Sequence, residues 1–327
     1  MNVLLMYTPD PPSDDHLRRL RDLDPSLTVN AAFSEAEALQ WAPTTEVILG
    51  HRYLRQVLPH APLLRWVQST SGATDALPEA TLAARNILLS RFTGGSRLVA
   101  QHAFAMAWAL TRALPTLVQQ QATGTWAKGL PLLPAPERAL VLGTGEIGRA
   151  LADLLGSHEV QVTGVKQHVD GPVPPFDTVL DTINWRSALP NTDWCFLALP
   201  NTDSTANMMD EAALRALPAH ALVVNVGRGE TLDWPALIRV LESGHLGGVA
   251  LDVVPHALNP LPANHPLWTT PRLLLSPHVA GHAPARPALV EQFIESQVAR
   301  YLAGRPLANV VLPQASSRSS LPLSPAP

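Results

Sequence analysis

The hexapeptide Gly143-Thr144-Gly145-Glu146-Ile147-Gly148 constrains the fold more than any other feature of the sequence. It follows a short apolar run at 138–142, which is typical of a strand, and it opens a segment with helical patterning. In this setting Gly143 permits a tight turn, Gly145 lets the backbone approach a diphosphate, and Gly148 lets the helix pack closely on the strand. The unpaired N–H groups at the helix N-terminus would hold the diphosphate, although an ordinary glycine-rich turn is the alternative. The pattern predicts a dinucleotide site whose contacts are Gly143, Gly145, Glu146, Ile147 and Gly148.

The end of the next predicted strand, at 161–165, bears on which dinucleotide is preferred. An acidic side chain at this point would accept hydrogen bonds from the ribose 2′-hydroxyl of NAD. The sequence instead has Lys166 and His168, with no carboxylate before Asp170. Because Lys166 and His168 can pair with a 2′-phosphate, NADP(H) is favoured over NAD(H) as the cofactor. A solvated loop lysine is the alternative interpretation, and it would leave the choice open.

The length and the alternation of strand-like and helix-like segments predict the domain organisation. A chain of 327 residues has room for two domains of about 100–200 residues each. Alternating strands and helices favour parallel sheets with right-handed crossovers. We therefore expect an α/β protein with two Rossmann-like, doubly wound parallel-sheet domains, the cofactor domain being inserted in the substrate domain. The predicted bounds are 98–285 for the dinucleotide-binding domain, 1–97 plus 286–312 for the substrate (catalytic) domain, and 313–327 for a disordered, proline-rich tail.

Composition excludes several classes of partner. Hydrophobic residues make up 46% and charged residues 15% of the chain, which suits globular cores, and the net charge is −4. Such a charge offers no field to attract nucleic acid or an anionic membrane, and no unbroken apolar stretch is long enough to span a bilayer. The single cysteine, Cys195, lies in an apolar run and fits a buried strand position in a cytoplasmic protein. No metal site is predicted.

Five further motifs follow one another in a characteristic order. They are LALPNTDST at 197–205, NVGRGETLDWPAL at 225–237, GGVALDV at 247–253, PLPANHPLW at 260–268 and SPHVAG at 276–281. Together they resemble the D-isomer-specific 2-hydroxyacid dehydrogenase family, and the glyoxylate/hydroxypyruvate reductase branch is the most similar. The resemblance is strong from about residue 98 to 281 and weaker before. It implies NAD(P)H-dependent reduction of a small 2-oxo acid to the 2-hydroxy acid, and the reverse reaction, by a cytoplasmic homodimer.

The resemblance assigns the chemistry to Arg228 and His278. Arg228 matches the family's substrate arginine, and a planar guanidinium can grip a carboxylate with two hydrogen bonds. His278 matches the acid/base histidine, which would give a proton to the carbonyl oxygen during reduction and take it back during oxidation. Imidazole suits both directions because its ordinary pKa lies near neutrality. A surface arginine and a structural histidine are the alternatives, which the surrounding motifs disfavour.

One expected catalytic residue is replaced. The family glutamate that pairs with the histidine has its place taken by Asn259, and no Asp or Glu lies between Asp252 and Glu291. A carboxylate would raise the histidine pKa by favouring the imidazolium, whereas an amide can only orient the ring. We therefore expect either a more acidic optimum for reduction or impaired catalysis. Impairment keeps open a second function, a dinucleotide-sensing binding protein of the same fold with weak or lost turnover.

The resemblance also implies further contacts. The cofactor positions are Leu199, Pro200 and Asn201 over the nicotinamide ring, Val226 and Gly227 beneath it, Asp252 near the carboxamide, and Gly281. For Asp252 a strand-end cap is the alternative. Backbone N–H groups at Ser71 and Gly72 would bind the substrate carboxylate. Finally, the apolar pattern at 98–117 predicts one helix that is buried or lies between domains or subunits.

Overall fold

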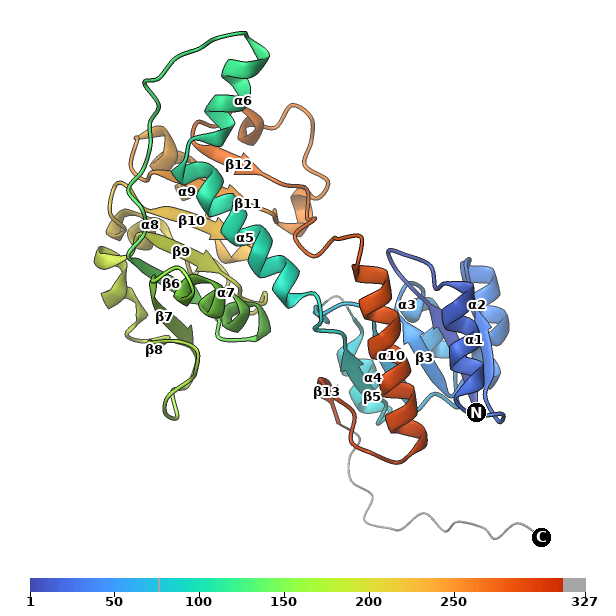
Figure 1. Ribbon diagram of the computed structural model, residues 1–327. Coiled ribbons are helices and arrows are strands. Elements are labelled where there is room, and N and C mark those ends of the chain that lie inside the picture. The colour runs from blue at the N-terminus through green and yellow to red at the C-terminus, as the bar shows by residue number, and fades with distance from the viewer. Residues whose placement is uncertain (76, 314–327) are drawn as a thin grey trace, which may run out of the picture. The chain divides into compact units, whose positions relative to one another are not determined.

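The computed structural model describes residues 1–75 and 77–313 (Figure 1). The chain divides into two compact units, and unit 1 consists of Met1–Gly94 together with the described residues from 284 to 313. Unit 2 is the inserted segment Gly95–Ala283. Each unit is an α/β structure built on a largely parallel sheet, which confirms the predicted fold class. The predicted disordered tail lies outside the described residues, except for Pro313.

Unit 1 contains a six-stranded sheet in the order β13-β5-β4-β3-β1-β2. Its strands are β1 (Asn2–Met6), β2 (Thr28–Ala31), β3 (Val47–Gly50), β4 (Trp66–Ser69), β5 (Leu88–Arg91) and β13 (Val310–Leu312). All neighbours pair in parallel except β13, which runs antiparallel to β5. Strand β5 is therefore not at the edge of the sheet, because the returning chain adds β13 outside it. An antiparallel edge strand of this kind is common on otherwise parallel sheets.

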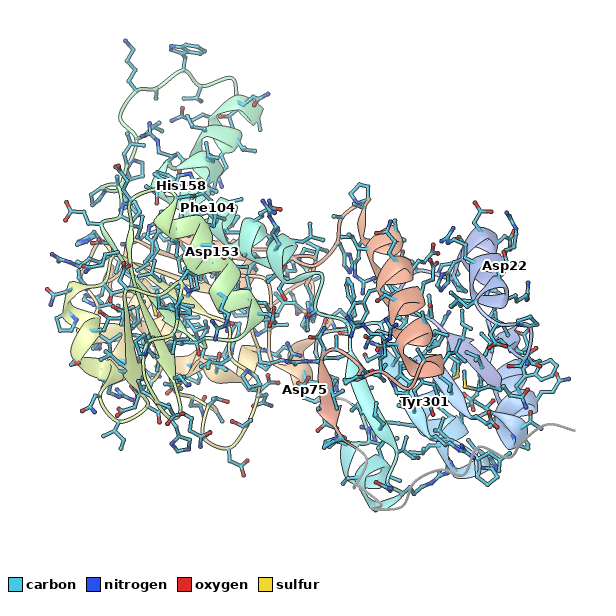
Figure 2. All side chains as sticks on the ribbon, turned by 60° about the horizontal axis from the view of Figure 1, so that its bottom comes forward. Asp22, Asp75, Phe104, Asp153, His158 and Tyr301 are labelled. Atoms are coloured by element: carbon cyan, nitrogen blue, oxygen red, sulfur yellow. The ribbon has the colours of Figure 1, made fainter. Side chains whose placement is uncertain are left out.

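The helices of unit 1 cover its sheet. They are α1 (Asp14–Asp22), α2 (Glu35–Trp41), α3 (Leu54–Val57), α4 (Glu79–Ala84) and α10 (Arg286–Leu302), with the 3₁₀ turns η1 (Ala42–Thr44) and η2 (Leu58–His60). On α10, Val290, Ile294 and Val298 recur every fourth residue and join the buried core around Trp66. Tyr301, at the end of α10, stacks on Trp66 with ring centroids 4.8 Å apart (Figure 2). This apolar stripe explains why the last helix belongs to the first unit.

Unit 2 contains a seven-stranded, wholly parallel sheet in the order β12-β11-β10-β9-β6-β7-β8. Its strands are β6 (Arg138–Leu142), β7 (Gln161–Lys166), β8 (Thr178–Asp181), β9 (Trp194–Leu197), β10 (Leu222–Asn225), β11 (Gly248–Leu251) and β12 (Leu273–Leu275). Strand order reverses between β6 and β9, which creates a topological switch point. Ligands of open α/β sheets bind in the crevice at such a point, outside the carboxyl ends of the strands.

Helices cover both faces of the unit 2 sheet. They are α5 (Ser96–Thr111), α6 (Leu114–Ala122), α7 (Glu146–Gly156), α8 (Glu211–Ala216) and α9 (Trp234–Glu242), with the 3₁₀ turns η3 (Trp185–Asn191), η4 (Gly229–Thr231), η5 (His256–Leu258) and η6 (Pro266–Thr269). Side chains of β6 alternate between two cores, Leu140 packing with α8 and α9, and Val141 with α5 and α7. Phe104 of α5 lies against His158, just beyond α7, with ring centroids 4.7 Å apart (Figure 2).

The single helix expected at 98–117 is a wrong prediction. Helix α5 ends at Thr111, Ala113 adopts the left-handed conformation with φ +52°, and α6 begins at Leu114. Pro115 causes the break, because its ring would clash with the carbonyl four residues earlier in a continuous helix. Proline is tolerated in the first turn of a new helix instead. Within the described ranges no helix is both long and apolar enough to cross a membrane.

Candidate functional site

The predicted residues of unit 2 gather at one edge of its sheet. Because the seven strands are parallel, their carboxyl ends share that edge. The positions follow the strands in turn: Gly143–Gly148 after β6, Lys166 and His168 at and after β7, Leu199–Asn201 after β9, Val226–Arg228 after β10, Asp252 after β11, and His278 and Gly281 after β12. Asn259 belongs to the longer loop between β11 and β12. The edge and its switch point match the place where this class of sheet binds a dinucleotide.

The glycine turn after β6 has room for a diphosphate at one position only. Gly143 has φ +108°, and a Cβ on it would lie 2.6 Å from the Ala198 carbonyl oxygen. A Cβ on Gly148 would lie 1.9 Å from the Gly143 carbonyl oxygen. A Cβ on Gly145 would meet nothing within 4 Å, and no side chain caps the N-terminus of α7 there. The outer glycines therefore serve packing, whereas the space at Gly145 fits the diphosphate of a dinucleotide.

Glu146 and Ile147 form the first turn of α7. Glu146 is exposed and Ile147 is half-buried against the core beneath α5 and α7. Their backbone N–H groups belong to the helix terminus that lacks a side-chain cap. These groups remain candidate coenzyme contacts through the backbone.

Lys166 and His168 differ in how the sheet holds them. Lys166 is the last residue of β7 and pairs in register with Asp181 of β8, whereas His168 lies exposed in the following loop. The Asp181 carboxylate accepts hydrogen bonds from the backbone N–H groups of Ile183 and Asn184. In the part of the chain that the structure describes, Lys166 forms no ion pair. The Asp181 carboxylate at the end of β8 is therefore already hydrogen-bonded within the turn that follows β8.

Asn225 fixes the backbone that carries Arg228. Its side chain is fully buried at the end of β10. The amide nitrogen Nδ2 donates to the Arg228 carbonyl oxygen at 2.9 Å, and Oδ1 accepts from the Gly227 N–H at 3.0 Å. The Thr231 hydroxyl also donates to the Arg228 carbonyl, at 2.7 Å. A buried amide with both ends satisfied holds this turn in one geometry.

Two glycines let the loops on either side press against Arg228. A Cβ on Gly227 would lie 2.6 Å from the Leu199 carbonyl oxygen, and one on Gly229 would lie 2.2 Å from the Pro255 nitrogen. The loops after β9 and β11 therefore sandwich the turn. The Arg228 guanidinium is half-buried, and its Nη1 donates to the Gly227 carbonyl oxygen at 2.7 Å.

A carboxylate in the same turn anchors the loop that contains Asn259. Glu230 Oε1 accepts from the His256 N–H at 2.7 Å, at the start of η5. Asn259 caps the C-terminus of η5 and is exposed. Among the residues that the structure describes, no hydrogen bond joins Asn259 to His278. A role for Asn259 beside His278 therefore remains a proposal.

The loop that carries His278 is organised around the Asp252 carboxylate. Asp252 is 2% exposed, and its oxygens accept from the Ser276 hydroxyl at 2.5 Å, the Val279 N–H at 2.9 Å and the Ala280 N–H at 3.0 Å. The His278 N–H donates to the Asp252 carbonyl oxygen at 2.9 Å. His278 itself has φ +56° and an exposed side chain. Asp252 therefore does more than cap a strand, since it gathers the whole turn that presents the imidazole. Gly281 follows directly.

The loops after β9 and β10 also lie at this edge of the unit 2 sheet. Leu199 is half-buried against the core, whereas Pro200 and Asn201 are exposed. Val226 is buried and its N–H donates to the Leu197 carbonyl oxygen at 3.1 Å. Of these predicted coenzyme contacts, Pro200 and Asn201 are therefore the ones whose side chains are exposed to a ligand.

In unit 1 the loop after β4 offers one backbone donor rather than two. The Ser71 N–H donates to the Ser69 hydroxyl at 3.0 Å, and the Ala73 N–H donates to the Ser71 hydroxyl at 3.2 Å. The Gly72 carbonyl accepts from Arg91 at 2.9 Å. The Gly72 N–H has no acceptor among the described residues, and Gly72 is exposed. Gly72 is therefore the better candidate for an anion than Ser71.

Arg286 and His51 lie beside the same loop. Arg286 Nη2 donates to the Thr70 carbonyl at 3.0 Å, and the Thr70 hydroxyl donates to the Thr8 carbonyl at 3.1 Å. His51 Nδ1 lies 3.1 Å from the Ser69 hydroxyl. Burial, and then the charge of Arg286, lowers the pKa of His51. Both residues support the loop from below.

Sequence reasoning missed Asn225, Glu230, Ser276 and Arg286. A polar residue that ends or follows an apolar strand was the available signal for Asn225 and Ser276. Glu230 lies in the same motif as Arg228, and nothing in that motif indicates that its carboxylate holds another loop. Nothing local marks Arg286, because its partner Thr70 is 216 positions away in the sequence.

The fold and the site geometry together define a dinucleotide-binding protein of the Rossmann class. Residues 104–280 match the family model "D-isomer specific 2-hydroxyacid dehydrogenase, NAD binding domain". Because this match covers more than half of the sequence, the chain belongs to the D-isomer-specific 2-hydroxyacid dehydrogenase family. It is an oxidoreductase with a nicotinamide-dinucleotide-binding domain, and the predicted family is confirmed.

Individual relatives support the predicted branch. A glyoxylate reductase from Thermofilum pendens is 29% identical over 283 residues, which span 83% of this chain and 76% of the relative. A glyoxylate/hydroxypyruvate reductase A from Salmonella heidelberg is 27% identical over 275 residues, 84% of this chain and 85% of the relative. The structure of a D-isomer specific 2-hydroxyacid dehydrogenase from Xanthobacter autotrophicus, in complex with NADPH and MES, has a TM-score of 0.76 at 25% identity and covers 95% of this chain and 97% of that one.

Proposed function

We propose that the chain reduces a small 2-oxo acid of the glyoxylate/hydroxypyruvate type with NADPH, and oxidises the corresponding 2-hydroxy acid in reverse. One observation carries the proposal. The turn of Arg228 and the loop of His278 are joined to the glycine turn by successive loop contacts along one sheet edge. The names of the glyoxylate reductases among the relatives support the substrate class.

The residues divide the chemistry between them. The bound coenzyme supplies or accepts a hydride at C4 of its nicotinamide. Arg228 pairs its guanidinium fork with the substrate carboxylate and so orients the 2-oxo group. Within unit 1, the Gly72 N–H beside Ser71 is the backbone donor that we propose for binding a carboxylate. His278 protonates the carbonyl oxygen during reduction and removes the same proton during oxidation.

The preference for NADPH rests on the end of β7. Lys166 is the last residue of β7, and His168 lies exposed in the loop that follows. Both would pair with a 2′-phosphate, whereas the acid typical of NAD sites is missing. The Xanthobacter autotrophicus relative was solved with NADPH, which agrees with this assignment.

The residue at the usual glutamate position affects the pH range of the reaction. Asn259 has no charge, so it does not stabilise an imidazolium at position 278. We therefore assign the enzyme a reductive optimum on the acidic side of that expected with a carboxylate partner.

A dinucleotide-sensing protein with weak or lost turnover is the second candidate, and Asn259 is the observation that favours it. An assay at 340 nm with NADPH and NADH separates the two, using glyoxylate, hydroxypyruvate, pyruvate and phenylpyruvate. Loss of absorbance with glyoxylate or hydroxypyruvate, faster with NADPH, supports the reductase. Tight NADPH binding without turnover of any 2-oxo acid supports the sensor.

We further propose a homodimer. Helix α6 has no buried residue, and the segment 113–136 exposes Val118 by 64%, Trp126 by 95% and Leu132 by 50%. Exposed apolar groups in such numbers are typical of a protein interface, and a second copy is the occupant we propose. Light scattering should give a dimer, and Val118→Asp combined with Trp126→Ser should give a monomer. We also propose a cytoplasmic location, because a chain with a single cysteine forms no internal disulfide. Burial raises the pKa of the Cys195 thiol to about 12 and keeps it unreactive.

A further inference from the structure

A histidine on α5 reaches the loop of His278 through two other side chains. His102 Nε2 lies 3.0 Å from the Ser276 hydroxyl and 3.6 Å from Asp252 Oδ1. The Ser276 hydroxyl lies 2.5 Å from the same carboxylate oxygen. A carboxylate only accepts, so the single hydroxyl proton of Ser276 goes to Asp252. Ser276 then accepts from His102, which fixes the proton of that ring on Nε2.

The series of contacts that runs from His102 through Ser276 ends on the Asp252 carboxylate. This carboxylate organises the loop that carries His278. The Asp252 side chain is 1% exposed, so water does little to stabilise its charge. Its other donors, the Val279 and Ala280 N–H groups, come from the loop itself. Of these hydrogen-bonded residues, His102 lies outside the loop of His278, on helix α5, which packs against α7 and β10.

The backbone at His278 depends on these contacts. A non-glycine residue at φ +56° is held in a sparsely populated region, which persists only where surrounding contacts over-determine it. The carboxylate of Asp252 supplies such contacts on the C-terminal side of His278. Loss of the His102 donor to Ser276 would weaken the contacts of Asp252 with this loop, because hydrogen bonds in a chain polarise one another.

We propose that His102 is a positioning residue for the acid/base step, acting through Ser276 and Asp252 on the loop that carries His278. The proposal rests on the proposed function, since it presumes that His278 transfers the proton. His102 itself touches neither substrate nor coenzyme in this account. His102 connects the loop that carries His278 to helix α5 through hydrogen bonds.

Hydrogen exchange on the full-length protein tests the structural half of the proposal without any turnover. His102→Leu removes the donor, whereas His102→Gln keeps an N–H donor on a similar chain. Exchange in the 276–282 segment should become about tenfold faster in the Leu variant, the loss expected for one buried hydrogen bond, and should stay slow in the Gln variant. His158→Gln is the matched control, because its ring also hydrogen-bonds within unit 2 but at the far end of α7.

Steady-state kinetics test the catalytic half. His102→Leu should lower kcat about tenfold with the dissociation constant of NADPH within about twofold of wild type, and His102→Gln should recover most of kcat. Ser276→Ala should show the same loss, and the double variant His102→Leu/Ser276→Ala should lose no more than either single one.

The outcomes separate the two claims. Unchanged exchange in the Leu variant, or a Gln variant as impaired as the Leu variant, would overturn the proposal. General acceleration across unit 2 in both His102→Leu and Ser276→Ala would also overturn it, since a positioning role predicts a local effect. A wild-type protein without turnover would refute the proposed function, while local acceleration in the Leu variant would still support the hydrogen-bond chain.

Discussion

Gly148 faces the carbonyl oxygen of Gly143 so closely that a Cβ at position 148 would lie 1.9 Å from it. This contact lets α7 begin directly on the end of β6. It also means that the three glycines of one motif respond differently to the same substitution.

Gly148→Ala should destabilise unit 2 by about 1–3 kcal/mol, because the new methyl group forces backbone apart. Gly145→Ala meets nothing within 4 Å and should leave stability almost unchanged. The Gly145 variant should instead bind NADPH at least about tenfold more weakly, since its methyl group occupies the space for the diphosphate. Urea unfolding and fluorescence titration measure the two effects. Full coenzyme affinity in the Gly145 variant would contradict the assignment of the turn.

The coenzyme preference can be tested at a single lysine. Lys166→Ser should weaken NADPH binding about tenfold and leave NADH binding unchanged. Only NADPH has a 2′-phosphate, and this group would lose its positively charged partner. Arg18→Ser is the control, since it also removes an exposed positive charge but belongs to unit 1. Equal weakening of both coenzymes by Lys166→Ser would show that the lysine acts through something other than the 2′-phosphate.

Restoring the missing carboxylate should change the pH dependence of reduction. In Asn259→Glu a carboxylate near His278 would stabilise the imidazolium, so the alkaline limb of the pH–rate profile should move up by about one pH unit. Asn259→Gln controls for side-chain length without adding charge. A limb that stays in place in the Glu variant would show that position 259 does not act on the histidine.

His51 should make unit 1 less stable at mildly acidic pH. Burial, and then Arg286, lowers the pKa of His51 below the usual histidine value of about 6.5. Between these two pKa values the unfolded chain holds more protons than the folded chain. Stability is therefore complete above about pH 6.5 and falls as the pH drops through the folded-state pKa.

Urea unfolding of wild type and His51→Gln between about pH 5 and pH 8 measures this contribution. The variant, which has no proton to gain at this position, should show a flatter pH dependence over the same range. An identical slope in the two proteins would contradict the lowered pKa.

The sequence was sufficient where local signals agree. Helix α9 begins where the local residues favour a helix start, because Asp233 caps it and Pro235 occupies its first turn. Strand β6 has the predicted bounds because it is a buried apolar run that ends in the glycine turn. The order of strands then brought the candidate residues to one edge without any knowledge of side chains.

The parts of the fold and of the site that the sequence did not predict depend on distant hydrogen bonds, turn geometry and very short strands. The use of the Ser71 N–H by Ser69 depends on a turn geometry that composition does not specify. Short strands such as β8 and β13 gave too few residues for a periodic pattern. The link between His102 and Ser276 spans 174 positions, so no local window contains both.

The account depends most on Arg228 and His278 acting on a substrate while the coenzyme is held elsewhere. The most direct measurement combines NADPH titration with turnover at 340 nm on wild type, Arg228→Gln and His278→Gln. We predict NADPH affinity within about twofold of wild type in both variants, with kcat/KM for the 2-oxo acid lowered about 10²–10⁴-fold. Variants that retain turnover, or that lose NADPH affinity in step with turnover, would contradict the account.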